Sequence, residues 1–241
     1  MGAHARILLL FALLAAPTVR AAEPPALVTM AVGQNTATSA AGAMRILAKG
    51  DAVYPKEVLA TGPNSYLNVR MSDGSFVLLR PASRFVIEDY RYTARTTVAP
   101  VQTPAAAGAP QNRALMRLLR GGFRAVSGAI GHSDPDAYRV NTPVATIGIR
   151  GTDYVAVICD AACALDPVIA ENLPPGAAAE DSLLAGVVEG AIVLTGNEGG
   201  AQTDVLRDHF VLSLRGGRVA PLPAEPRFLR VDPIPNPRIC Q

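Results

Sequence analysis

One stretch of the sequence, residues 141–154, holds the side chains best suited to binding chemistry; it reads N-T-P-V-A-T-I-G-I-R-G-T-D-Y. Its alternation predicts a β-strand with Ile147 and Ile149 in the core and Arg150 on the more polar face. A guanidinium at such a place can hold a carboxylate, a phosphate or a sugar acid through paired hydrogen bonds. The candidate binding residues are Arg150, Thr152, Asp153 and Tyr154.

The same stretch also has a structural interpretation, in which it only lets a strand bend. Gly151 would permit a β-bulge and Thr152 would stabilise it, while Arg150 would pair with a carboxylate or with backbone carbonyls of a neighbouring strand. Bulges and paired arginines occur in most β domains, so this interpretation is the favoured one. The binding interpretation stays open beside it.

Residues for catalysis or metal binding are scarce. Apart from His4, the histidines are His132 and His209, which lie far apart in the sequence, so a histidine-rich metal centre is not expected. Ser127-Gly128 lacks the G-x-S-x-G context of a nucleophile elbow. The sequence therefore predicts no metal site, no cofactor and no enzymatic activity.

The three cysteines suggest one disulfide. Cys159 and Cys163 are four residues apart, and in an oxidising compartment such a pair is typical of a bond that staples a tight loop. A zinc site would need two further ligands, and none is evident nearby. Cys240, the penultimate residue, is expected to be a free or exposed thiol on a tail.

The N-terminal segment MGAHARILLLFALLAAPTVRAAEPPA is typical of a signal peptide, cleaved after about residue 21. Its apolar run of about 10 residues is too short to span a membrane, which takes about 20. Removing Arg6 and Arg20 with this leader leaves 20 basic side chains against 20 acidic ones. A nearly neutral mature chain with few aromatics is not expected to bind nucleic acid. We expect a periplasmic or secreted protein without a transmembrane segment in the mature chain.

The elements that must position Arg150 are predicted to be short strands separated by turns. Residues 66–71 and 76–79 alternate on either side of Asp73-Gly74, which predicts a β-hairpin with a type I′ turn. Residues 114–119 are ambiguous between a strand and a short helix, because Gly121-Gly122 would end any helix within two turns. Further strands are predicted at residues 83–90, 123–130, 138–159, 184–195 and 205–214.

The predicted fold class is all-β, as a β-sandwich or a rolled antiparallel meander. The expected organisation has three parts: a signal peptide at 1–21, a β domain at 45–215, and a Pro-rich extended tail at 216–241. Residues 93–112, rich in Ala, Pro and Thr, are expected to form a flexible insertion in the β domain, because they offer too little apolar surface to order themselves.

Several motifs in this order resemble the FecR domain. They are Met71-Ser72-Asp73-Gly74-Ser75, the run from Leu119 to Gly128, the run from Tyr138 to Thr152, and Val187-Val188-Glu189-Gly190-Ala191-Ile192-Val193-Leu194. The most specific of them is T-P-x-A-x-x-G-x-R-G-T at residues 142–152, and the resemblance spans about residues 45–215.

The resemblance implies a periplasmic β-rich module of the kind first recognised in the ferric-citrate signalling regulator. Regulators of this family carry a cytoplasmic anti-sigma segment and one membrane helix before the domain. This sequence has the predicted leader there instead, so it resembles the free-standing secreted members.

The leading functional hypothesis is a non-catalytic periplasmic module that binds an envelope protein, or a carbohydrate or other small ligand, in signalling or envelope function. The alternative is a structural component of a cell-surface or secretion assembly that binds no small molecule. A third hypothesis is an enzyme whose site assembles from residues scattered along the chain.

Overall fold

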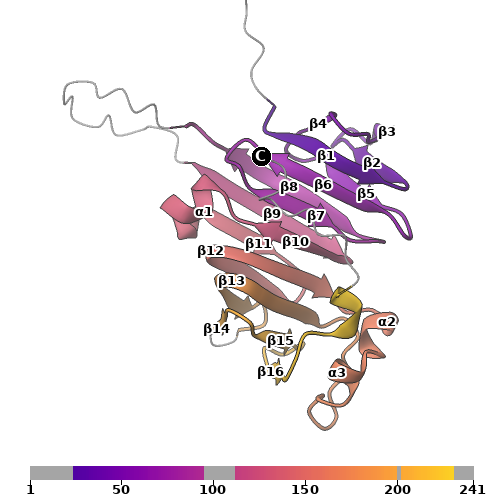
Figure 1. Cartoon of the computed structure of the whole chain (residues 1–241), viewed down its shortest axis with the longest axis vertical. Helices are drawn as coiled ribbons and strands as arrows, with labels where there is room; N and C mark the ends of the chain where they lie inside the picture. Colours follow the sequence, from indigo (N-terminus) through magenta and orange to yellow (C-terminus); the bar gives the residue numbers. More distant parts are fainter. Residues whose placement is uncertain (1–23, 95–111, 200–201, 231–241) are drawn as a thin grey trace, which may run out of the picture.

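The computed structural model describes residues 24–94, 112–199 and 202–230 (Figure 1). Within these residues the chain is all-β, as predicted, and its strands form one curled 16-stranded sheet resembling half of a barrel. The predicted signal peptide at 1–21, most of the predicted insertion at 93–112, and Cys240 lie outside the described residues.

The strands are β1 (Ala26–Val32), β2 (Asn35–Thr38), β3 (Met44–Ile46), β4 (Ala52–Val53), β5 (Val58–Thr61), β6 (Tyr66–Met71), β7 (Phe76–Leu79), β8 (Arg84–Arg91), β9 (Arg113–Arg120), β10 (Gly122–Val126), β11 (Tyr138–Asn141), β12 (Ala145–Ile158), β13 (Leu183–Gly196), β14 (Thr203–Leu206), β15 (Phe210–Ser213) and β16 (Val219–Leu222). The helical elements are α1 (Ala129–Ser133), η1 (Pro135–Ala137), α2 (Ala161–Ala164), α3 (Pro167–Ala170) and η2 (Arg227–Leu229). Across the described ranges, no helix is long and apolar enough to cross a membrane.

Two long strands, β12 and β13, pass from one part of the sheet to the other. In β12, residues 146–148 pair with β11, whereas residues 153–157 pair with β10. In β13, residues 183–186 pair with β15, whereas residues 191–194 pair with β14. The sheet therefore folds into two layers that share these two strands.

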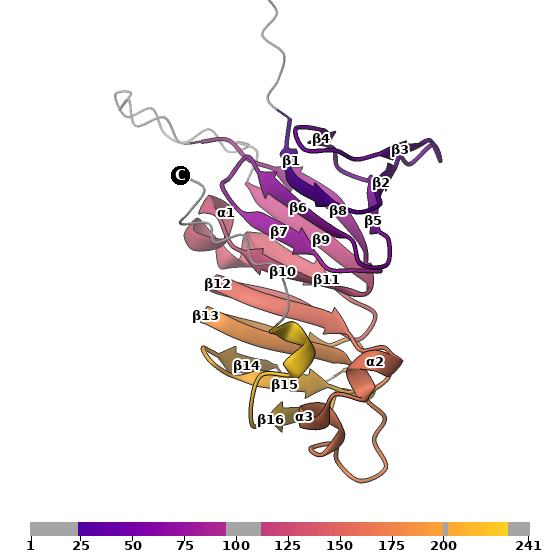
Figure 2. The ribbon, with the colours of Figure 1, turned by 45° about the vertical axis from the view of Figure 1, so that its right-hand side comes forward.

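Layer A runs β3-β2-β5-β8-β9-β11, then the first half of β12, the second half of β13, and β14. Layer B runs β4-β1-β6-β7-β10, then the other halves of β12 and β13, and then β15 and β16 (Figure 2). The main core lies between the layers and takes side chains from both. Three rings connect the layers in edge-to-face contacts: Phe85 with Phe123 at 5.3 Å between ring centroids, and Phe123 with Tyr154 at 5.6 Å.

A smaller core lies on the outer side of layer B. It consists of apolar side chains of β12, β13, β15 and β16 covered by α2, α3 and η2. Leu222 and Leu229 are buried there, so the start of the predicted extended tail contributes a strand and a short helix. Strands β1 and β2 and strand β16 extend the sheet beyond both ends of the range 45–215.

The predicted hairpin at residues 66–79 is confirmed, but the type I′ turn is wrong. That turn needs positive φ at both central residues, and of Asp73 and Gly74 only Gly74 has it, at +83°. The turn closes with Gly74 N–H donating to Met71 C=O at 3.0 Å, and Met71 N–H donating to Ser75 C=O at 2.9 Å. A longer loop therefore joins β6 to β7.

The structure also decides one ambiguous prediction and corrects two others. Residues 114–119 lie in strand β9, which pairs with β8 and β11. The predicted strand at 123–130 ends at Val126, and α1 begins at Ala129. The meander is not wholly antiparallel, because β9 and β11 run parallel.

Candidate functional site: an arginine groove beside a β-bulge

The stretch Arg150-Gly151-Thr152 forms a β-bulge at the point where β12 leaves layer A for layer B. The register against β13 shifts between Arg150 and Asp153, and Gly151 takes φ of +58°. Thr152 is 2% exposed, and its hydroxyl donates to the Ala191 carbonyl at 2.7 Å and accepts from Arg150 N–H at 3.2 Å. This hydroxyl therefore satisfies backbone groups that the bulge takes out of the ladder.

The partner strand makes room for the bulge at Gly190. This residue has φ of +80°, and a Cβ atom added to it would lie 2.1 Å from the Gly151 carbonyl oxygen. Only glycine combines that backbone conformation with so close an approach. On the other side, the ring of His132 in α1 lies over Gly151, where a Cβ would be 3.0 Å from Nδ1.

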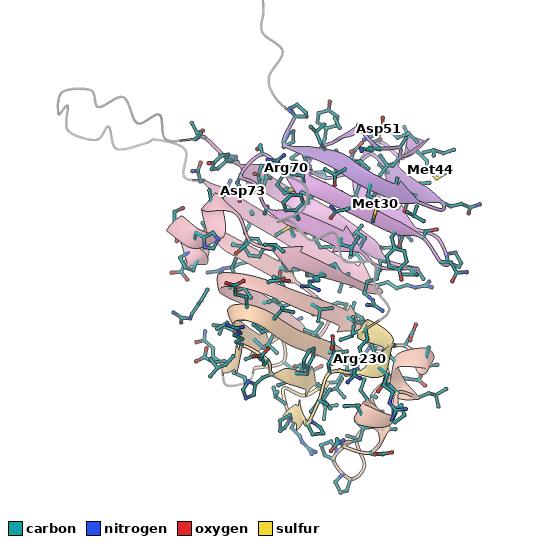
Figure 3. The ribbon with its side chains drawn as sticks, in the orientation of Figure 1. Met30, Met44, Asp51, Arg70, Asp73 and Arg230 are labelled. Atoms are coloured by element: carbon teal, nitrogen blue, oxygen red, sulfur yellow. A yellow bond between two sulfur atoms is a disulfide. The ribbon has the colours of Figure 1, made fainter. Side chains whose placement is uncertain are left out.

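Two other motifs of the sequence, both in layer B, hold the bulge and the α1 helix beside it. Ser127 accepts from Thr152 N–H through its Oγ at 2.8 Å, and its own N–H donates to the Thr152 carbonyl at 2.9 Å. Asp73, beside the first turn of α1 in Figure 3, accepts Ala129 N–H on its carbonyl at 2.9 Å and Ile130 N–H on its carboxylate at 3.3 Å. Residues far apart in the sequence therefore meet at one structural joint.

The joint presents the Arg150 side chain to solvent on the outer face of layer A. There Arg150 and Arg139 line a groove of about 650 Å³, together with Asp136, Thr146, Thr195 and Gln202. Arg139 lies opposite Gly148 in the register, so Arg150 is its diagonal neighbour, at roughly 7–8 Å between Cα atoms. Gly148 has no side chain between the two guanidinium groups, and a Cβ there would meet only Val193, at 3.9 Å.

Two other arginines on the same face have carboxylate partners. Arg113 pairs with Asp89 at 2.5 Å and Arg117 with Glu88 at 2.6 Å. Arg139 and Arg150 are exposed, and neither guanidinium has a hydrogen bond or ion pair with any residue that the structure describes. The groove therefore holds two adjacent positive charges against the single carboxylate of Asp136.

The structure separates the four predicted binding residues. Arg150 faces the groove, whereas Thr152 is buried in the bulge. Asp153 accepts two hydrogen bonds from Arg124, at 2.8 and 2.7 Å, in a half-buried pair. Tyr154 lies in the main core at 0% exposure, away from the groove.

The bulge explains why Tyr154 faces the core and Arg150 faces the groove. One extra residue in β12 shifts the alternation, so that Tyr154 and Ala156 face the core that Ile147 and Ile149 faced before it. The Tyr154 hydroxyl bonds to that of Tyr138 at 3.1 Å, and burial raises the pKa of both phenols. Because each hydroxyl has a hydrogen-bond partner, the pair is a structural part of the core.

The groove has the hydrogen-bond donors of a binding site. The described residues contain no group of three or more His, Cys, Asp or Glu able to hold a metal ion. Guanidinium forks match carboxylate and phosphate oxygens, and Thr146, Thr195 and Gln202 can hydrogen-bond the hydroxyls of a ligand. The arrangement suits recognition of an anion that also carries hydroxyl groups.

Of the groove residues, only Arg150 was selected from the sequence. Arg139 was missed, although the alternation of Y-R-V-N places it on the same polar face as Arg150. Thr195 and Gln202 come from β13 and the segment after it, and their approach depends on strand register. No local motif marks them.

The predicted disulfide is present and lies away from the groove. Cys159 and Cys163 are bonded, with 5.2 Å between their Cα atoms, and both are buried in the smaller core. Asp160 between them caps α2 by accepting Cys163 N–H at 2.9 Å. The bond therefore fixes the local shape of the α2 turn.

Comparison with known proteins gives a family model and distant structural similarities. The family model described as "FecR protein" matches residues 57–193. No curated protein matches the sequence. Two solved structures described as a "putative anti-sigma factor" from Parabacteroides distasonis are 9% and 10% identical, with TM-scores of 0.47 and 0.45. Each similarity covers 72% of this chain and 62% of the other, so the chain spans less than two thirds of those relatives.

Proposed function

Since this chain belongs to the FecR family, we propose that its β domain is a non-catalytic binding module of the cell envelope. In this proposal the arginine groove recognises an acidic ligand that carries hydroxyl groups, such as an acidic carbohydrate. The ligand would connect the module to a signalling or envelope role. The periplasmic location remains an expectation from the N-terminal sequence.

One observation carries the proposal: two neighbouring arginines line a groove without partners among the described residues. The nearby Arg113 and Arg117 show that this face can pair its arginines when carboxylates are supplied. Like charges at diagonal positions repel each other, so an anion bound between Arg139 and Arg150 would relieve that repulsion.

The architecture supports the proposal, because the bulge holds the backbone of Arg150 in a fixed position. Buried hydrogen bonds of Thr152 and Ser127 and the close contact of Gly190 fix the backbone on which Arg150 stands. A donor fixed in this way loses less conformational entropy on binding than one on a mobile loop.

The test is calorimetric titration of the chain without residues 1–21 with an oligogalacturonate. Inorganic phosphate and a neutral malto-oligosaccharide serve as comparison ligands. We expect the acidic sugar to bind and the neutral sugar not to bind. Arg150→Ala and Arg139→Ala should each weaken binding about tenfold or more, the loss typical of a hydrogen bond to a charged group. Arg84→Ala is the matched control, because Arg84 is exposed on the same layer outside the groove.

Equal binding by Arg150→Ala and Arg84→Ala would contradict the proposal. If phosphate binds and the acidic sugar does not, the groove is an anion site and the carbohydrate part of the proposal is wrong. If no ligand binds and both groove variants remain folded, the alternative of a structural component in an envelope assembly is favoured.

A further inference from the structure

The two layers of the sheet end unequally beyond β13. Layer B continues with β15 and β16, whereas layer A continues with β14 alone. Val211, Val219 and Pro221 lie on the face of layer B that is turned toward layer A. Among the described strands, layer A provides none to cover β16.

A cavity of about 570 Å³ lies at this unequal end. Val205, Val211, Val219 and Pro221 form its apolar walls, and Thr203, Asp204 and His209 are among the polar residues of its rim. Val205 and Val211 are 1% and 7% exposed and also belong to the main core. The cavity is therefore the open mouth of the space between the layers, and it shares no residue with the arginine groove.

The two strands at the mouth differ in what their edges offer. Strand β14 pairs with β13 only, so its other edge meets no strand within the described part of the chain. Its residues T-D-V-L all carry a backbone N–H, and Leu206 is 57% exposed. Strand β16 contains Pro221, which has no N–H to donate and blunts that edge.

We propose that the edge of β14 accepts an extended segment of a partner protein as an added strand. Hydrogen bonds to the β14 backbone would lengthen layer A by one strand. The inward side chains of the guest would enter the cavity, which suits β-branched aliphatic groups because Val205, Val211 and Val219 line it. The outward side chains would lie beside Asp204, which favours Lys or Arg.

Other occupants fit this edge less well. Residues 231–241 carry proline at 233, 235 and 237, each without the N–H that a strand donates. A second copy pairing through its own β14 would bring another Asp204 carboxylate to the edge. A segment from a different protein that carries basic and aliphatic side chains complements both the Asp204 carboxylate and the apolar walls of the cavity.

The experiment uses fluorescence anisotropy with the chain lacking residues 1–21 and a labelled peptide of sequence V-K-V-K-V. Comparison peptides replace the central valine by proline, or both lysines by glutamate. We expect each change to weaken binding about tenfold or more. Amide hydrogen exchange at residues 203–206 should slow when the first peptide binds, because those groups gain partners.

Protein variants test the same point from the other side. Asp204→Lys and the milder Asp204→Asn should both weaken binding of V-K-V-K-V, and Asp204→Lys should strengthen binding of the glutamate peptide. Ile46→Lys is the matched control, since Ile46 is 80% exposed on the edge strand β3, outside the cavity. Its binding should equal that of the unmodified chain.

Three results would overturn the proposal. The first is that the proline peptide binds as tightly as V-K-V-K-V, or that Asp204→Asn binds V-K-V-K-V as tightly as the unmodified chain does. The second is self-association that Asp204→Lys changes, which would assign the edge to a second copy. The third is a tenfold gain in peptide affinity on deleting residues 231–241, which would assign the edge to the chain's own terminus.

Discussion

At the scale of single residues, glycine at position 190 decides whether the bulge can form. We expect Gly190→Ala to lower the free energy of unfolding by about 2–5 kcal/mol, the sum of a left-handed alanine and an overpacked contact. A Cβ there would lie 2.1 Å from a backbone oxygen that cannot move aside without breaking the bulge. Urea unfolding followed by circular dichroism measures the change.

Gly74→Ala is the matched control for this prediction. Gly74 has a similar φ of +83°, but a Cβ there would meet nothing within 4 Å. Its substitution should cost only the backbone term, about 1–2 kcal/mol. Equal losses in the two variants would mean that Gly190 matters for its conformation alone, and that its contact with Gly151 does not constrain the joint.

The buried phenols of Tyr138 and Tyr154 predict how stability changes at alkaline pH. Burial raises the pKa of both groups above their ordinary value of about 10. In the unfolded chain they lose protons as the pH passes about 10, while in the folded chain they keep them. The stability that they contribute is therefore complete below pH 10 and is lost as the pH rises from about 10 toward the folded pKa.

The measurement is urea unfolding of the intact chain between about pH 9 and pH 11. We expect the free energy of unfolding to fall over this window, and Tyr138→Phe to make the fall shallower because one phenol no longer titrates. The control variant is Tyr54→Phe, which removes a phenol hydroxyl from a tyrosine that is 51% exposed. An identical slope for Tyr138→Phe and the unmodified chain would contradict this assignment.

At the scale of elements, the short helix η2 holds the C-terminal part of the described chain onto layer B. The Phe228 N–H donates to the Asp166 carboxylate at 3.2 Å, and Leu229 is 5% exposed in the smaller core. We expect Leu229→Ala to cost about 2–5 kcal/mol in urea unfolding, the usual loss for a buried leucine. Leu165→Ala, at an 80% exposed leucine of the same region, should change stability by less than about 0.5 kcal/mol.

The outcome distinguishes a structural tail from a loosely attached one. If Leu229→Ala and Leu165→Ala behave alike, η2 does not contribute to global stability. Limited proteolysis after Arg227 or Arg230 then reports whether the segment opens locally, since cleavage follows the population of the open form.

The elements also show how far sequence reasoning reaches here. The alternation in residues 66–79 predicts a hairpin because both faces of each strand are set by nearby residues. The α1 helix is different: its first N–H groups bond to Asp73, more than 50 residues away, so no local pattern announces it. Strand β9 has helix-forming residues, and its pairing with β8 and β11 overrides that propensity.

The candidate site follows the same division. Arg150 could be placed on the polar face because Ile147 and Ile149 lie before the bulge, where alternation still holds. Tyr154 lies beyond the bulge, where the count is shifted by one residue. Arg139 joins Arg150 only through the register of β11 against β12. The sequence can thus identify a single candidate residue of the site, whereas the residues that come to lie beside it depend on strand register.

At the scale of the whole molecule, the two shared strands should make the described layers unfold as one unit. Strands β12 and β13 pair with each other over both layers, and the main core takes side chains from each layer. Separating the layers would require breaking β12 and β13 at the bulge and exposing that core. Neither layer can therefore lose its structure while the other keeps its own.

We expect a single urea transition that is the same by two probes. Circular dichroism reports the sheet, and tyrosine fluorescence reports the core, since the chain has no tryptophan and Tyr138 and Tyr154 are buried between the layers. Gly190→Ala should move both curves together to lower urea, because it weakens the joint through which the layers are connected. Two separated transitions, or a variant that shifts one probe alone, would show that the layers are independent and that the bulge is only a local feature of β12.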